Sequence, residues 1–254
     1  MDLTLFQLSG KNALVTGSRK GLGAGIALAL ARAGANIACH GRSPSDAGIV
    51  ENIQRAGVKS VYISGDVGDP AACERMFKAA LAEFGTIDIL VNNAGIIRRA
   101  PAVEYSLKDW DEIIAVNLTA VFRLSQFAAQ HMMQRRTGGK IVNVASLLSF
   151  QGGILVPAYA AAKAGVAQLT RAMANEWAVH GINVNAIAPG YMVTDNTTAL
   201  REDPTRSRQI LERIPAGRWG NPEDLGGAAV FLASAASDYV HGHVLAVDGG
   251  WLGR

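Results

Sequence analysis

This 254-residue sequence has few residues of the kinds that build metal sites or disulfide frameworks. It contains only two cysteines, Cys39 and Cys73, together with five histidines. Neither cysteine belongs to a metal-ligand spacing, so both are predicted to be buried free thiols. His241 and His243 lie two residues apart without a third ligand, which does not make a zinc pattern. We therefore expect no metal site.

The sequence also lacks long apolar runs and strongly charged tracts. No stretch approaches the ~18 apolar residues that cross a bilayer, and the N-terminus has no secretory pattern. The formal net charge is only +3. Short basic clusters at 98–101 and 132–140 have no interleaved aromatic residues, which favours a solvated face over a nucleic-acid surface. These absences predict a cytoplasmic protein without nucleic-acid or membrane partners.

Short apolar runs alternate instead with longer amphipathic segments, without a linker or repeat. Strands are expected at 13–17, 36–40, 61–66, 87–95, 139–146, 182–190 and 243–250, where the fourth and sixth ranges include the following loop. Helices are expected at 22–33, 46–56, 70–84, 107–135, 157–179 and 222–235. This alternation predicts a single α/β domain over residues 1–254, with a Rossmann-type doubly wound parallel sheet of about seven strands and helices on both faces. The less regular segment 191–221 is a predicted substrate lid.

A glycine-rich loop, TGSRKGLG (16–23), joins the first strand to the first helix. Glycines there let the backbone approach a pyrophosphate, while the helix N-terminus faces its negative charge. The alternative is a plain tight turn. The residues expected to contact a dinucleotide in this loop are Gly17, Arg19, Lys20, Gly21, Leu22 and Gly23.

The end of the second strand bears on the choice between NAD and NADP. An acidic residue there would bind the ribose 2′-hydroxyl, but no carboxylate follows until Asp46. Arg42, assisted by Arg19 or Lys20, is expected to bind a 2′-phosphate instead, which favours NADP(H). The alternative is three solvent-facing cations. Asp66, after the third strand, either accepts a hydrogen bond from the adenine amino group or caps the next turn.

Ser146, Tyr159 and Lys163 form the most informative group. The four-residue spacing places Tyr159 and Lys163 on one face of a helix. A tyrosine pKa is about 10, and a nearby cation lowers it by stabilising the phenolate. With a serine hydroxyl that holds a carbonyl or alcohol, these groups can move a proton while a hydride moves at the adjacent carbon. The alternative for Tyr159 and Lys163 is a chance pair.

Asn117 lies in the middle of a predicted helix, where asparagine is a mediocre helix former. It indicates either a kink with a freed carbonyl and a water next to Lys163, or an ordinary hydrogen-bonded core asparagine.

Together, TGSRKGLG, NNAG (92–95), Asn117, Ser146, Tyr159-x-x-x-Lys163 and PGYMVT (189–194) resemble the short-chain dehydrogenase/reductase family over almost the whole chain. The resemblance implies that Tyr159 is the acid/base, Ser146 orients the reacting oxygen and Asn117 supports a proton relay. Lys163 would lower the pKa of Tyr159 and hold the ribose hydroxyls. Further cofactor contacts are implied at Val67, Asn93, Ala94, Gly95, Pro189, Gly190, Met192 and Thr194. The resemblance also implies a homotetramer, with one interface made by helices 107–135 and 157–179.

Longer stretches, among them NNAGIIRRAPA, SLLSFQGG and RIPAGRWG, resemble a branch of this family that acts on deoxy sugar acids. A sugar-acid substrate needs a carboxylate partner, and the candidate substrate residues are Arg98, Arg99, Gln151, Tyr191 and Arg201. Arg218 is equally consistent with a structural role, in which it would fix the segment 191–221. The branch favours NAD(H), but members associated with NAD lack the Arg19-Lys20 and Gly41-Arg42 pattern of this chain. The alternatives are a reductase of 3-oxoacyl carrier proteins or small ketones, and a non-catalytic dinucleotide-binding protein.

Overall fold

The computed structural model describes residues 3–46 and 48–254, which form one seven-stranded sheet in the order β3-β2-β1-β4-β5-β6-β7. Every neighbouring pair of strands is parallel, which confirms the predicted doubly wound sheet. The strands are β1 (Asn12–Val15), β2 (Asn36–Gly41), β3 (Ser60–Ser64), β4 (Ile89–Asn92), β5 (Gly139–Val144), β6 (Ile182–Pro189) and β7 (Val244–Val247). Met1, Asp2 and Ala47, which belong to the predicted domain, lie outside the described residues.

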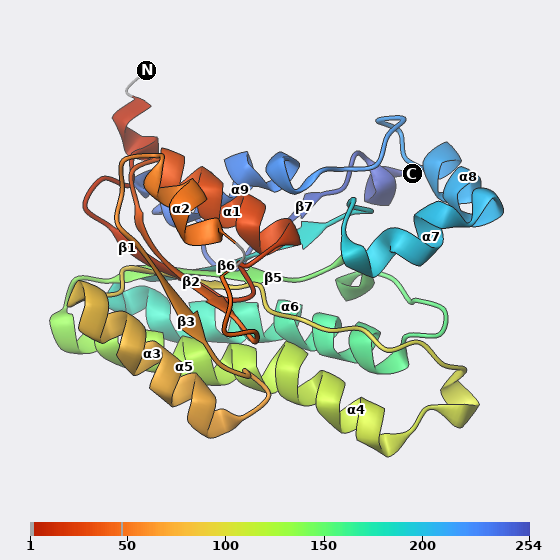
Figure 1. Ribbon diagram of the computed structural model, residues 1–254, viewed down its shortest axis with the longest axis horizontal. Coiled ribbons are helices and arrows are strands. Elements are labelled where there is room, and N and C mark those ends of the chain that lie inside the picture. Colours follow the sequence, from red (N-terminus) through yellow and green to blue (C-terminus); the bar gives the residue numbers. More distant parts are fainter. Residues whose placement is uncertain (1–2, 47) are drawn as a thin grey trace.

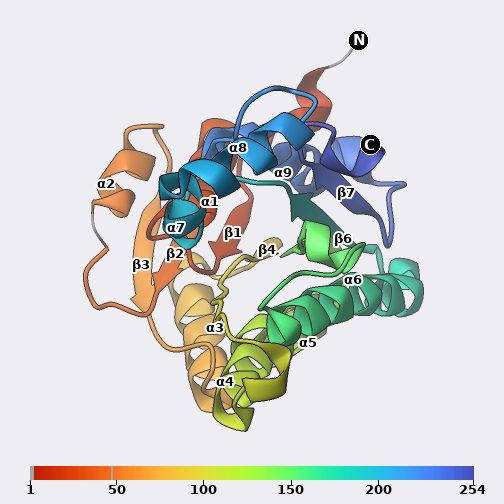
Figure 2. The ribbon, with the colours of Figure 1, turned by 90° about the vertical axis from the view of Figure 1, so that its right-hand side faces the viewer.

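Helices cover the sheet in two layers, with α1, α2 and α9 on one face and α3, α5 and α6 on the other (Figure 1). The helices are α1 (Gly21–Arg32), α2 (Ile49–Gln54), α3 (Pro70–Phe84), α4 (Leu107–Ile114), α5 (Ala120–Arg135), α6 (Pro157–Trp177), α7 (Thr198–Glu202), α8 (Pro204–Arg213) and α9 (Gly226–Ala233). Figure 2 shows the same layers from the side on which α7 and α8 project.

The sheet is buried on both faces because its strands are almost continuously apolar. Neighbouring residues of β1 belong to different cores: Leu14 packs into the core under α3 and α5, and Val15 into the core under α1 and α9. All eight residues of β6 are buried. The polar side chains at the carboxyl ends of these strands are therefore presented from a rigid frame.

Three predicted helices differ in their boundaries. The predicted helix 107–135 is divided into α4 and α5 by a π-helical turn at Ala115–Thr119, which contains Asn117. The predicted helix 222–235 begins with a 3₁₀ turn, Pro222–Leu225, before α9. The predicted helix 46–56 begins only at Ile49, because Gly48 adopts a left-handed conformation with φ +77° that ends helical geometry in the N-terminal direction.

The segment 191–221 is more regular than predicted, because it contains α7 and α8. Asp203 accepts hydrogen bonds from the amides of Thr205 and Arg206, and Pro204 takes the first helical position, so both residues favour the start of α8. The two helices project beyond the carboxyl ends of the strands, next to the C-terminus (Figure 1).

Candidate active site

The carboxyl ends of the strands surround a cavity of about 770 Å³. Its lining includes Ser146 and every residue that the sequence predicted for cofactor binding, among them Gly17 after β1, Arg42 after β2, Asp66 after β3 and Asn93 after β4. A volume of this size is within the range of small-molecule and cofactor sites. The tertiary structure therefore brings residues from six strand ends around one space.

The glycine loop packs so closely against the loop after β4 that side chains do not fit between them. Gly17 has φ +64°, and a Cβ atom on it would lie 2.9 Å from the Cα of Ala94. A Cβ on Gly23 would lie 2.3 Å from the carbonyl oxygen of Gly17. The side-chain Nδ2 of Asn93 fixes this arrangement by donating to the carbonyl oxygens of Thr16 (2.9 Å) and Gly17 (3.1 Å). The side chain of Asn93 therefore links the glycine loop to the loop after β4.

The N-terminus of α1 fits an anionic group. Lys20 is the N-cap residue of α1, and its side chain accepts no hydrogen bond from the first turn. The first amide groups of α1 are therefore not capped by this residue. Gly21 lines the cavity at this end with φ +59°. The positive end of the helix dipole adds to this preference for negative charge. The glycine loop therefore fits the pyrophosphate of a dinucleotide. Backbone amides of this loop and of the first turn of α1 would hold the pyrophosphate.

Two arginines line the cavity near the end of β2: Arg42, which follows the strand, and Arg19 of the glycine loop. Arg42 is exposed and makes no hydrogen bond or ion pair with another described residue. Arg19 donates from Nε to the carbonyl oxygen of Ser45 (2.9 Å), and its Cβ lies 3.2 Å from the position of a Cβ on Gly41. Lys20 instead pairs with Asp195 of the segment 191–221. Of the three predicted cations, Arg19 and Arg42 lie at the end of β2 and Lys20 is directed elsewhere.

Asp66 acts as a turn cap in this structure. Its Oδ1 accepts a hydrogen bond from the amide of Gly68 at 2.9 Å. The carboxylate also lines the cavity, so a contact with adenine stays a prediction.

Tyr159 and Lys163 lie on the same face of α6, as their spacing predicted. The Nζ of Lys163 is 5.7 Å from the centre of the Tyr159 ring and donates to the carbonyl oxygen of Val144 at 2.6 Å. Lys163 is 3% exposed. Ser146 follows β5, where its Oγ accepts a hydrogen bond from the amide of Leu148 (3.2 Å). Of the four predicted catalytic residues, Ser146, Tyr159 and Lys163 line the cavity, whereas Asn117 does not.

Burial disfavours the charged forms of both Tyr159 and Lys163. Burial raises the pKa of Tyr159. A hydrogen bond with Ser146 and the positive charge of Arg99 partly offset this by lowering the pKa. Burial also lowers the pKa of Lys163 to about 8. A neutral phenol is suited to donate a proton to a substrate oxygen. The expected lowering of the Tyr159 pKa by Lys163 stays a prediction.

Asn117 is fully buried, and its side chain is closed onto the backbone of Ile96. Its Oδ1 accepts from the Ile96 amide (2.9 Å) and its Nδ2 donates to the Ile96 carbonyl oxygen (2.8 Å). Both alternatives for this residue are thus partly met, because the hydrogen-bonded core asparagine lies within a distorted helical turn. Its part in a proton relay stays a prediction.

The substrate candidates Arg98 and Arg99 point to different partners. Arg98 makes a bidentate contact with Glu112, at 3.0 and 3.1 Å from Nη2. Arg99 donates to the carbonyl oxygen of Asn196 (3.0 Å) and acts electrostatically on Tyr159. Arg99 therefore links the loop after β4 to the segment 191–221, close enough to Tyr159 for its charge to act on the phenol.

Arg201, on α7, has an incomplete set of hydrogen-bond partners. Its Nη2 donates to Thr198 at 3.3 Å, but its buried Nε has no hydrogen-bond partner among the described residues. The pKa of Asp195 is lowered mainly by its hydrogen bond with Lys20 and the charge of Lys20, and the charge of Arg201 acts in the same direction.

The remaining candidates, Gln151 and Tyr191, pack against aromatic residues at the base of the segment 191–221. Gln151 accepts a hydrogen bond from Nε1 of Trp251 at 3.3 Å, and Tyr191 stacks at a tilt on Trp251 with ring centres 4.6 Å apart. Neither lines the large cavity, and the same is true of Arg98, Arg99 and Arg201.

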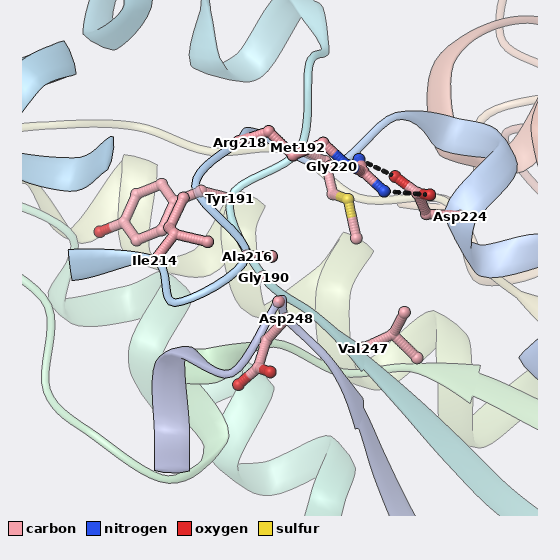
Figure 3. Close-up of a pocket in the computed structure, with 11 residues that line it drawn as sticks. Gly190, Tyr191, Met192, Ile214, Ala216, Arg218, Gly220, Asp224, Val247 and Asp248 are labelled. Atoms are coloured by element: carbon pink, nitrogen blue, oxygen red, sulfur yellow. Dashed lines mark hydrogen bonds and ion pairs between the residues drawn. The ribbon is translucent and has the colours of Figure 1, made fainter. Parts of the chain in front are cut away.

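Tyr191 lines a smaller cavity of about 200 Å³, shown in Figure 3, with Ile214 beside it and the Arg218–Asp224 pair on the other side. Arg218 contacts Asp224 with both terminal nitrogens, at 2.7 and 2.8 Å. Val193 also donates to the carbonyl oxygen of Gly220 at 2.7 Å. The Val193–Gly220 bond joins the two ends of the segment 191–221. The Arg218–Asp224 pair stabilises its C-terminal end, which explains Arg218 as a structural residue.

Several cavity residues were not singled out from the sequence: His40, Gly65, Asp195, Asn196 and Thr197. A histidine near the end of an apolar strand was the available signal for His40. No local signal existed for the others, because they reach the cavity through the path of their loops.

Both predicted free thiols are confirmed. Cys39 and Cys73 are buried and free, and burial raises the pKa of each thiol to about 11, so neither is a nucleophile near neutral pH. Within residues 3–46 and 48–254, no helix has the length and apolar character to span a membrane, and no cluster of three or more histidine, cysteine or acidic residues is arranged to hold a metal ion.

Comparison with known proteins gives full-length matches. A family described as enoyl-(acyl carrier protein) reductase matches residues 17–252. The chain is 55% identical over 259 residues to 2-dehydro-3-deoxy-D-gluconate 5-dehydrogenase of Escherichia coli K12, and the match spans 100% of both proteins.

Among solved structures, one from Agrobacterium tumefaciens, provisionally named 2-deoxy-D-gluconate 3-dehydrogenase and containing NADP, has a TM-score of 0.93 and 55% identity, and the match covers 98% of this chain and 99% of that one. Gluconate 5-dehydrogenase from Burkholderia cenocepacia, in complex with NADP and tartrate, has a TM-score of 0.95 and 42% identity over 99% of both chains.

Proposed function

Because this chain belongs to the short-chain dehydrogenase/reductase family, we propose that it interconverts a hydroxyl and a keto group on a deoxy sugar acid of the 2-dehydro-3-deoxy-D-gluconate type. The observation that carries the proposal is the meeting of Ser146, Tyr159 and Lys163 at the cavity that the glycine loop borders. The 55% identity to the Escherichia coli enzyme along the entire chain supports the substrate class.

The residues of this chain divide the chemistry between them. When bound, the nicotinamide supplies or accepts a hydride at the substrate carbon. Tyr159 gives the proton to the substrate oxygen in reduction and takes it back in oxidation. Ser146 orients that oxygen by a hydrogen bond. Lys163, held by the carbonyl of Val144, keeps positive charge near the phenol and binds the ribose hydroxyls.

We also propose that the cofactor is NADP(H). Two observations support this preference: Arg42 is without a partner among the described residues at the end of β2, and Arg19 packs on the adjacent Gly41. A guanidinium matches a phosphate by two parallel hydrogen bonds. The Agrobacterium and Burkholderia proteins were both solved with NADP.

The substrate carboxylate is proposed to bind Arg99, with Arg201 as a second cation. Arg99 acts electrostatically on Tyr159 and contacts the segment 191–221. We propose this segment as a lid because backbone hydrogen bonds join its two ends while α7 and α8 project. The orphaned Nε of Arg201 is a donor without an acceptor. Arg98 is the weaker candidate, since Glu112 already neutralises it.

A homotetramer in the cytoplasm is the proposed form of the enzyme. Exposed apolar side chains on α4 and α5 support an interface there, with Leu107 79%, Trp110 38% and Phe122 40% exposed. Buried free thiols at Cys39 and Cys73 are typical of a reducing compartment.

The test is a substrate screen with both nicotinamide cofactors. We expect turnover of 2-dehydro-3-deoxy-D-gluconate or a related C6 sugar acid, and little turnover of neutral sugars or of 3-oxoacyl thioesters. The free acid and its amide should then be compared. If wild-type enzyme turns over acid and amide equally, no carboxylate anchor exists and the sugar-acid assignment fails. Preferred turnover of acyl thioesters would establish the carrier-protein reductase instead.

A further inference from the structure

We propose that His40 is a positioning residue for the dinucleotide, because its imidazole joins the glycine loop after β1 to the loop after β3. Nδ1 accepts a hydrogen bond from the amide of Gly17 at 3.1 Å, and Nε2 lies 3.0 Å from the carbonyl oxygen of Gly65. The side chain is 2% exposed. His40 itself is the residue before Gly41 at the end of β2. The inference rests on the proposed binding of a nicotinamide cofactor to this cavity.

The two hydrogen bonds determine the protonation state of the ring. The Gly17 amide can only donate, so Nδ1 must carry a lone pair and the proton must be on Nε2. Nε2 then donates to the Gly65 carbonyl oxygen, which can only accept. This is the neutral imidazole in a single tautomer. An imidazolium would turn an N–H toward the N–H of Gly17 and lose that bond.

The backbone of His40 strengthens the same connection. Its amide donates to Oγ of Ser18 at 2.9 Å, and its carbonyl oxygen accepts from the Ser18 amide at 2.8 Å. The glycine loop is therefore attached to β2 through three bonds to one residue. Since Gly17 and Gly65 both line the cavity, His40 sets the spacing between the glycine loop and the loop after β3, which contains Asp66.

The surroundings favour the neutral ring. Titratable or charged groups on the neighbouring segments are Arg19, Lys20, Cys39, Arg42, Asp46, Tyr62 and Asp66. Burial lowers the pKa of His40 from 6.5, and the Gly65 hydrogen bond and the charge of Asp66 oppose this effect. Cys39 and Tyr62 have raised pKa values and are uncharged near neutral pH. Acidification below the ordinary histidine range is thus expected to release the glycine loop.

Two substitutions separate the hydrogen bond from the titration. His40→Asn keeps an acceptor near the position of Nδ1 but does not titrate. His40→Leu removes both hydrogen bonds. Dissociation constants for NADPH are to be measured by fluorescence titration between pH 5 and pH 8.5 for wild type and both variants. Because a phosphate monoester titrates near pH 6 itself, the series is repeated with NADH, which lacks the 2′-phosphate.

For wild type, affinity for both dinucleotides should fall only at pH values below the ordinary histidine pKa of 6.5, because burial lowers the pKa of His40. His40→Asn should bind within about threefold of wild type at pH 8 and should lose the fall in NADH affinity. His40→Leu should bind about tenfold or more weakly at pH 8, because the partly buried Gly17 amide loses its acceptor.

A wild-type fall in NADH affinity that persists in His40→Asn would overturn the inference, as would unchanged affinity of a folded His40→Leu at pH 8. If His40→Leu does not fold, judged by circular dichroism, the pH series of His40→Asn decides. Failure of wild type to bind either dinucleotide at pH 8 would overturn the proposed function, and this inference with it.

Discussion

Replacing Arg42 with alanine should convert an NADP(H) preference into near indifference between the two cofactors. Arg42 is exposed and has no hydrogen-bond or ion-pair partner among the described residues, so the substitution removes no hydrogen bond or ion pair within that part of the fold. A hydrogen bond to a charged group contributes about 1.5–3 kcal/mol, and solvent exposure places this one at the low end. About 1.5 kcal/mol corresponds to roughly a tenfold change in the ratio of kcat/KM values. Adding Arg19→Ala should bring the change to about 100-fold if the two contacts are independent.

The assay is the ratio of kcat/KM for NADPH to kcat/KM for NADH, measured at one fixed substrate concentration. Lys20→Ala is the matched control, since Lys20 lines the same cavity but pairs with Asp195. It should change both values by similar factors. The wild-type ratio should also fall with ionic strength, because exposed charges are screened. An unchanged ratio in Arg42→Ala would show that this arginine does not read the 2′-position.

Three further substitutions test the site. Tyr159→Phe should bind cofactor normally and lose roughly 10²–10⁴-fold or more of kcat, since only the proton-transfer group is removed; retention of a tenth of the activity would contradict its role. Arg99→Ala should lower kcat/KM about tenfold for the acid and far less for the amide, whereas Arg98→Ala should leave both unchanged; equal effects of the two variants would count against the anchor. Gly23→Ala should abolish detectable cofactor binding in a fluorescence titration, because its Cβ would lie 2.3 Å from the carbonyl oxygen of Gly17; wild-type affinity would show that the loop adjusts.

Much of the fold followed from local patterns in the chain. Apolar runs such as 182–190 predicted strands buried on both faces, and all of β6 is buried. The spacing of Tyr159 and Lys163 predicted one helix face, since helical geometry is local and repeats every 3.6 residues. Boundaries were less well predicted where tertiary contacts or a glycine override propensity. The π-helical turn around Asn117 accompanies hydrogen bonds to Ile96, 21 residues away.

The sequence by itself therefore determined the sheet, the glycine loop and the common helix face of Tyr159 and Lys163, because each depends on residues close together in the chain. Only the tertiary structure decided which cations remain available, because their partners are distant in sequence. Lys20 is engaged by Asp195 and Arg98 by Glu112, whereas Arg42 stays without a partner in the described residues. The tertiary structure also decided the hydrogen-bond partners of His40. Its ring bonds to Gly17 and Gly65 only because three parallel strands end at the same edge of the sheet.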